Sequence, residues 1–275
     1  MAPRIRMGVS LSELGRAERR GNHASIAPTR AKLDAFCAAL GDAVGLEVVP
    51  YAAPRYDRLL RRLRLGEVEL AWLPPVLALA ALPKDASPVA MPIRGEQSWF
   101  WSALFTKPGS PITSTASLGQ AHAVWVNAES ASGYLVMRAA LRADGINPDV
   151  VFAKQSFAQS HDALVRTVLT DGECVGATYV HLDAKGSVAR AGWGDSEVRV
   201  LKRAGPIPAD VLAASNELPV EVRNRIEDAL VDASPPDLKN AANTLFSATS
   251  FARAETMHLA HLEVLGRYLL RERVR

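Results

Sequence analysis

Two short segments of the chain contain the residue types that bind small anions. The first, Asn127–Tyr134, joins an apolar run to a helical pattern, and the second, Gln159–Asp162, begins another helical pattern. Serine hydroxyls can cap a helix, while its first backbone N–H groups and the positive end of its dipole attract negative charge. A plain N-cap without a ligand explains the first segment equally well, and either Ser160 or Asp162 could simply cap the second.

Taken as an anion site, the second segment offers donors of two kinds. His161 would donate a ring N–H, and Ser160 would present its hydroxyl and its backbone N–H. If both helices follow strands of one sheet, their starts lie at the same edge and face one ligand. The order Ser160-His161-Asp162 does not indicate a catalytic triad, because consecutive residues at a helix start point about 100° apart. The chain contains no G-x-S-x-G, Walker-type or G-x-G-x-x-G motif.

The elements that must position these residues follow from the hydrophobic pattern. Apolar runs alternate with helical patterns, which predicts largely parallel strands linked by helices. The expected strands are 5–9, 46–49, 70–73, 102–106, 123–126, 150–153 and 175–179, with a further short apolar run at 211–214. The expected helices are 29–40, 56–65, 75–82, 133–143, 162–169, 220–232, 236–247 and 254–273. We therefore expect an α/β protein in which a β-α-β-α-β unit occurs twice.

Segments rich in proline and glycine separate the two units. They are Lys107–Pro111 and Gly205–Pro208. We expect residues 1–102 and 203–275 to form lobe one and residues 103–202 to form lobe two, each a mainly parallel sheet covered by helices. A cleft between two such lobes is a favoured place for a ligand.

Composition excludes some classes of partner. The 275 residues contain 32 Lys and Arg against 29 Asp and Glu, a net charge of +3, which is too small an excess to indicate a nucleic-acid partner. The arginines between Arg55 and Arg64 are interpreted as the solvated face of a helix whose apolar stripe is Leu59, Leu60, Leu63 and Leu65. No apolar run is long enough for a membrane span.

No cofactor or metal site is expected. Cys37 and Cys174 lie far apart in apolar surroundings and are interpreted as buried thiols. His258 and His261 are three residues apart on an expected helix, but exposed or hydrogen-bonded histidines are the more common case.

The first residues bear on the compartment. Met1–Arg4 lead directly into the apolar run 5–9, without a hydrophobic region of signal-peptide length or a small-residue cleavage site. We therefore expect a cytoplasmic protein, with a periplasmic location as the alternative if Met1 is not the natural start.

Three stretches in consistent order resemble a known family. They are YDRLLRRLRLGEVELAWLPPVLALAAL at 56–82, SASGYLVMRAAL at 130–141 and SHDALVRTVLTDGECVGATY at 160–179. Together they resemble the phosphate, phosphite and phosphonate substrate-binding proteins of ABC transporters. The resemblance implies a type II periplasmic-binding-protein fold.

The resemblance also implies a function and a set of binding residues. The ligand would be a small oxyanion, and the partner an ABC transporter permease or a signalling protein. The binding groups would be Ser130, the backbone of Ala131, Ser132 and His161, with Gly133 and Tyr134 completing the first turn, Ser160 preceding His161, and Asp162 orienting His161 or capping the helix.

The chain departs from the family pattern at three positions. Ala131 replaces the middle threonine of the first turn, Pro74 replaces the glycine of a Leu-Gly-Pro turn, and Ala78 replaces a tyrosine. Two alternatives therefore stay open beside a solute-binding protein for uptake or sensing. One is an enzyme on the same scaffold acting on a small anionic substrate, and the other is an interaction module that no longer binds a ligand.

Overall fold

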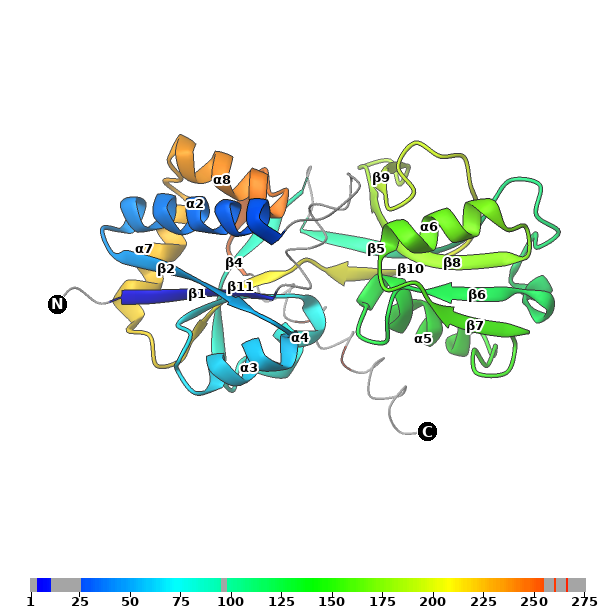
Figure 1. Cartoon of the computed structure of the whole chain (residues 1–275), viewed down its shortest axis with the longest axis horizontal. Coiled ribbons are helices and arrows are strands. Elements are labelled where there is room, and N and C mark those ends of the chain that lie inside the picture. The colour runs from blue at the N-terminus through cyan, green and yellow to red at the C-terminus, as the bar shows by residue number, and fades with distance from the viewer. Residues whose placement is uncertain (1–3, 11–25, 95–97, 255–259, 261–265, 267–275) are drawn as a thin grey trace. The chain divides into compact units, whose positions relative to one another are not determined.

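The computed structural model describes residues 4–10, 26–94, 98–254, 260 and 266, with only the backbone described for residues 26–29 (Figure 1). The chain folds into two compact units. Unit 1 contains Met1–Ser98 and Ala209–Ala260, and unit 2 contains Trp99–Pro208 and His261–Arg275. The expected helix 254–273 falls almost wholly outside the described residues, as do His258 and His261.

Unit 1 is built on a mixed six-stranded sheet in the order β12-β4-β11-β3-β1-β2. The strands are β1 (Arg4–Ser10), β2 (Glu47–Ala53), β3 (Leu70–Leu73), β4 (Ala86–Ile93), β11 (Val211–Ser215) and β12 (Ser250–Ala252). Strand β1 pairs in parallel with β2 and β3, while β11 is antiparallel to β3 and β4. The all-apolar β3 is buried along its whole length, as expected for a strand covered on both faces.

Helices cover both faces of this sheet (Figure 1). They are α2 (Ile26–Val44), α3 (Tyr56–Arg64), α4 (Pro75–Ala81), α7 (Val220–Val231) and α8 (Pro236–Phe246). Helices α2, α7 and α8 enclose the main apolar core of the unit with the sheet. In that core the ring of Trp72 stacks on Phe246 with 3.6 Å between centroids.

Unit 2 repeats the same arrangement on a sheet in the order β10-β5-β8-β6-β7, with β9 paired to β8. The strands are β5 (Trp99–Thr106), β6 (His122–Trp125), β7 (Lys154–Phe157), β8 (Cys174–Leu182), β9 (Val188–Ala191) and β10 (Arg199–Pro208). Strand β6 is parallel to β7 and β8, and β5 is antiparallel to β8. As in unit 1, the first parallel strand lies between the second and the third, and an antiparallel strand follows the third. The predicted α/β class is confirmed, but both sheets are mixed and not mainly parallel as expected, because antiparallel pairings outnumber parallel ones in each.

The helices described in unit 2 are the 3-10 helix η1 (Thr115–Gln120), the π-helical turn η2 (Ala131–Leu135) that continues into α5 (Val136–Ala143), and α6 (His161–Thr170). Of these, η2 and α6 begin at the two segments that the sequence singled out, whereas η1 was not expected. Leu164 and Val168 of α6 pack onto the sheet beside Gly176, where an added Cβ would lie 2.6 Å from a Leu164 methyl. Glycine at 176 therefore sets how closely α6 approaches β8.

The expected strand at residues 150–153 is wrong. The structure has turns and bends there, Val150 is 75% exposed, and the strand is β7 at Lys154–Phe157. Strand β7 lies at the edge of the sheet and is mostly exposed, so it lacks the apolar pattern that marks a buried strand.

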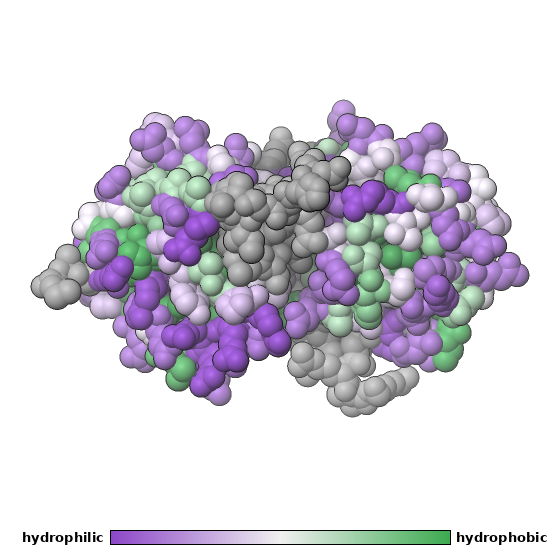
Figure 2. All heavy atoms as spheres, viewed as in Figure 1, coloured by the Kyte–Doolittle hydropathy of each residue, from purple (hydrophilic) through white to green (hydrophobic). Residues whose placement is uncertain are grey.

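The arginines of helix α3 form a solvated face, as predicted, but one leucine of the predicted apolar stripe is not buried. Figure 2 shows hydrophilic side chains gathered over α3. Leu59, Leu60 and Leu63 are buried, but Leu65 is 58% exposed because the helix ends before it. Among the residues that the structure describes, no helix is long and apolar enough to cross a membrane.

Candidate anion-binding site

The two serine-containing turns follow neighbouring strands of unit 2. Strands β6 and β7 are parallel, with Trp125 opposite Phe157 at their carboxyl ends. The backbone hydrogen bonds between the two chain segments continue beyond the ends of the strands. The N–H of Ala158 donates to the carbonyl of Trp125, and the N–H of Gln159 donates to the carbonyl of Val126, each at 2.8 Å. The turns that begin η2 and α6 therefore leave the sheet at the same edge (Figure 1).

Ser130 caps the first turn. Its Oγ accepts a hydrogen bond from the N–H of Gly133 at 3.1 Å, and its carbonyl accepts from the N–H of Leu135 at 3.0 Å, a five-residue span that makes the turn π-helical. Such turns are rare and occur frequently at functional sites. The first N–H groups of any helix have no carbonyl of their own helix to bind, so they are available to an anion.

Two close contacts hold this turn against the sheet. An added Cβ at Gly133 would lie 2.4 Å from Cγ2 of Val126, so only glycine permits the approach. The hydroxyl of Ser102 on β5 donates to the carbonyl of Ser132 at 2.6 Å, and both residues are buried. The position of Ser132 is therefore fixed from a strand distant in sequence.

Aromatic rings and a buried arginine support the same turn. Tyr134 packs edge-to-face on the buried Trp125, with 5.6 Å between centroids, and the guanidinium of Arg138 lies 4.8 Å from the centre of the Tyr134 ring. Arg138 is only 4% exposed and pairs with Asp149. Arg138 therefore supports the turn through its contact with the Tyr134 ring.

Ser160 caps the second turn. Its Oγ accepts from the N–H of Ala163 at 3.2 Å, which decides the open choice between Ser160 and Asp162 for the N-cap. Gln159, immediately before it, has a φ of 65°, so the chain turns sharply from strand into helix. Asp162 lies in the first turn, where a carboxylate favours the positive end of the helix dipole.

His161 is oriented by a residue that the sequence did not single out. Its Nδ1 lies 2.7 Å from Oγ1 of Thr178, a fully buried residue of β8. Its ring packs edge-to-face on Tyr179 at 5.2 Å. When the hydroxyl donates to Nδ1, the neutral ring carries its proton on Nε2 and can donate that proton to another group.

The structure places the family departures of unit 1 on helix α4. Pro74 is the N-cap residue of this helix, and Ala78 is fully buried within it. A tyrosine at position 78 would have to displace neighbouring side chains, so the alanine is part of the packing of unit 1.

Residues 24–259 match the family described as the periplasmic phosphonate substrate-binding protein of ABC transporters. The chain belongs to this family. No curated protein matches the chain in sequence. Solved structures with the same fold include XAC2383 from Xanthomonas citri bound to ATP, with 20% identity, 99% of each chain covered and a TM-score of 0.73.

Two further structures of phosphonate-binding proteins share the fold. The binding component of an ABC phosphonate transporter from Pseudomonas aeruginosa has 18% identity over 98% of this chain and 88% of its own, with a TM-score of 0.69. PhnD1 from Prochlorococcus marinus, in complex with methylphosphonate, has 16% identity over 97% and 98%, with a TM-score of 0.67. The predicted periplasmic-binding-protein fold is confirmed.

Family membership overturns the expected compartment. The family is periplasmic, so the cytoplasmic location inferred from Met1–Arg4 is wrong. A secretory signal is absent from the mature form of an exported protein, and the first residues of a sequence are therefore a poor guide to compartment. The family consists of transporter components and is not a class of enzymes, and membership implies a small ligand and a permease partner.

Proposed function

We propose that this binding protein takes a small phosphorus oxyanion, such as phosphate, phosphite or a phosphonate, at the turns Ser130–Tyr134 and Ser160–Asp162. The observation that carries the proposal is the position of two serine-capped helix starts at one edge of the unit 2 sheet. Each helix start supplies N–H groups, and a tetrahedral oxyanion has several oxygens that can accept them.

Each residue of the two turns has a role in this proposal. The backbone N–H groups of Ala131 and Ser132 and the hydroxyls of Ser130 and Ser132 donate to the anion. His161 donates from Nε2, with Thr178 holding the ring. Gly133 and Tyr134 set the position of the first turn. Ala131 contributes one hydroxyl fewer than the threonine of the family pattern, which lowers the number of donors.

The bound ligands of structural neighbours support the class of ligand. Methylphosphonate and ATP, found in the neighbours from Prochlorococcus marinus and Xanthomonas citri, both carry tetrahedral phosphorus with charged oxygens. A sulfonate-binding protein from Escherichia coli shares the fold at 14% identity with a TM-score of 0.59. Sulfate and a sulfonate are therefore the competing ligands that a test must include.

The proposed role is uptake, in which the loaded protein delivers its ligand to a permease. Solute-binding proteins commonly undergo a hinge motion between two lobes when they bind ligand, and we expect such a motion here. Small-angle scattering would detect closure as a smaller radius of gyration at saturating ligand.

A thermal-shift screen with phosphate, phosphite, methylphosphonate, sulfate and a small sulfonate tests the proposal. A ligand at about 100 times its dissociation constant adds roughly 2.7 kcal/mol to the free energy of unfolding. For a protein of this size that raises the melting temperature by about 5 to 10 °C. The phosphorus compounds should give this shift.

Variants then locate the binding site. Ser132→Ala and His161→Ala should each lose most of the shift, because each removes a donor. Ser114→Ala is the matched control, since Ser114 is also an N-cap serine of unit 2 but caps η1. The proposal would be contradicted if only sulfate or the sulfonate raised the melting temperature. It would also be contradicted if Ser132→Ala and His161→Ala both kept the full melting-temperature shift with the phosphorus compounds.

A further inference from the structure

A second cluster of polar side chains lies in unit 2, away from the two turns. His122 begins β6, Cys174 begins β8, and Asp171 is the C-cap residue of α6 in the short turn before β8. His122 and Cys174 are direct neighbours in the parallel pairing of their strands. The cluster thus lies where β6 and β8 begin, whereas the serine turns lie beyond the point where β6 ends.

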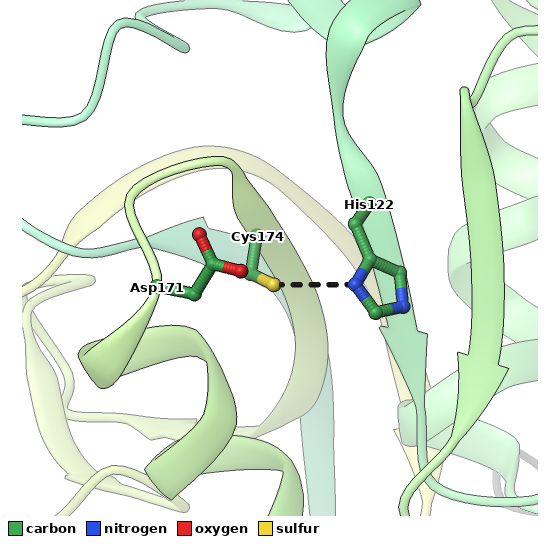
Figure 3. Close-up of side chains that lie close together, drawn as sticks. All are labelled: His122, Asp171 and Cys174. Atoms are coloured by element: carbon green, nitrogen blue, oxygen red, sulfur yellow. Dashed lines mark hydrogen bonds between the residues drawn. The ribbon is translucent and has the colours of Figure 1, made fainter.

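The side chains point toward one another. Figure 3 shows the carboxylate of Asp171 and the imidazole of His122 on either side of the Cys174 sulfur. One ligand atom from each residue lies within 4.8 Å of the others, and Sγ of Cys174 is 3.5 Å from Nδ1 of His122. Tetrahedral zinc, with bonds of about 2.3 Å to sulfur and about 2.05 Å to nitrogen, requires a separation of about 3.6 Å between these atoms. The sulfur and nitrogen already lie at that spacing.

Neighbouring groups hold the three side chains in place. Nε2 of His122 is 2.7 Å from Oγ of Ser156, which leaves Nδ1 as the atom facing the sulfur. A metal-bound histidine usually donates its other ring N–H in this way. Asp171 is fixed by the N–H of Glu173, which donates to Oδ1 at 2.9 Å, and by its own carbonyl, which accepts from the N–H of Cys174.

The surroundings determine how a cation would bind. Cys174 is fully buried, His122 is half-buried and Asp171 is exposed, so a cation would enter past the carboxylate. The positive charges of Lys154 and Lys107 oppose a cation, and the negative charge of Glu173 favours it.

We propose that His122 Nδ1, Cys174 Sγ and the Asp171 carboxylate form a Zn²⁺ site with water as the fourth ligand. Thiolate and imidazole ligands favour zinc over the hard cations Mg²⁺ and Ca²⁺, which take oxygen ligands. Zinc would displace the thiol proton as it binds. The bound ion would join the turn between α6 and β8 to the start of β6.

Titration of the full-length protein with Co²⁺, followed by displacement with Zn²⁺, tests the site. Thiolate-bound Co²⁺ absorbs strongly in the near ultraviolet, so one equivalent should produce this band and Zn²⁺ should remove it. Cys174→Ser should abolish the band. Cys37→Ser is the matched control, because Cys37 is also a buried free cysteine but lies in unit 1, and it should leave the band unchanged.

Two further variants keep the test decisive if Cys174→Ser fails to fold. Asp171→Asn changes an exposed residue and should weaken Zn²⁺ binding by at least about tenfold, and Ser156→Ala should weaken it by about 10- to 100-fold. Absence of the thiolate band, or unchanged affinity in Asp171→Asn, would overturn the proposal. Neither result would affect oxyanion binding, so the failure of this site and of the anion site can be told apart.

Discussion

Replacing Gly133 with alanine should destabilise unit 2 and disturb the first anion-binding turn together. The added Cβ would lie 2.4 Å from Cγ2 of Val126 and 2.7 Å from Oγ of Ser130, where an ordinary contact is 3.4 Å or more. Overpacking of this kind costs about 1 to 3 kcal/mol, and loss of the Ser130 cap costs about 1 kcal/mol more. The higher helix propensity of alanine compared with glycine offsets somewhat under 1 kcal/mol of this loss. The net expectation is a loss of about 2 kcal/mol.

Thermal and urea unfolding measure this loss. A loss of about 2 kcal/mol corresponds to a fall of about 4 to 8 °C in melting temperature. Gly119→Ala is the matched control, since Gly119 lies in the 3-10 helix of the same unit and an added Cβ there meets nothing within 4 Å. In the double variant with Val126→Ala, part of the loss should be recovered as a favourable coupling energy. If Gly133→Ala and Gly119→Ala unfold alike, the close approach of the turn to β6 is not what requires glycine.

Three further predictions concern the residues that support the site. Thr178→Val should weaken oxyanion binding about tenfold in calorimetry by releasing the His161 ring, while Thr178→Ser retains it; equal affinity in both variants would refute the role of the hydroxyl. Ser102→Ala should cost about 1 to 3 kcal/mol in chemical unfolding, because it leaves the buried carbonyl of Ser132 without its donor; a neutral result would contradict this. Burial would raise the pKa of Asp149, but two arginines of α5 outweigh it and lower the pKa. The free energy of unfolding of the parent should therefore exceed that of Asp149→Asn by its full amount above about pH 4, and this difference should decline as the pH is lowered further. A difference that does not depend on pH would contradict this.

The alternation of apolar and helical segments was enough to predict most elements of the core. Strand β3 and helix α3 were found within one residue of their bounds, because one is apolar throughout and the other has a clear stripe of leucines. Strands β4 and β10 were not predicted, since each contains prolines and pairs across an irregular register. Edge strands such as β7 carry too little apolar character to be recognised from one sequence.

The candidate site divides in the same way. Residue type and local spacing predicted that hydroxyl residues cap the first turn and left Ser160 and Asp162 as the two candidates for the second, and the structure shows Ser130 and Ser160 as the caps. The roles of Ser102 and Thr178 could not be predicted from the sequence. Ser102 contacts Ser132, which is 30 positions away, and Thr178 contacts His161, which is 17 positions away, and only the folded sheet brings these pairs together. The same holds for the cluster in Figure 3, in which His122 and Cys174 are 52 residues apart.

The most direct test of the central claim is isothermal titration calorimetry with methylphosphonate on the parent protein and on His161→Ala. The account predicts one site per chain in the parent, an affinity at least about tenfold lower in the variant, and parent-like affinity in the control Ser114→Ala. Binding of equal affinity in His161→Ala, or no binding of any phosphorus oxyanion to the parent below millimolar concentration, would contradict it.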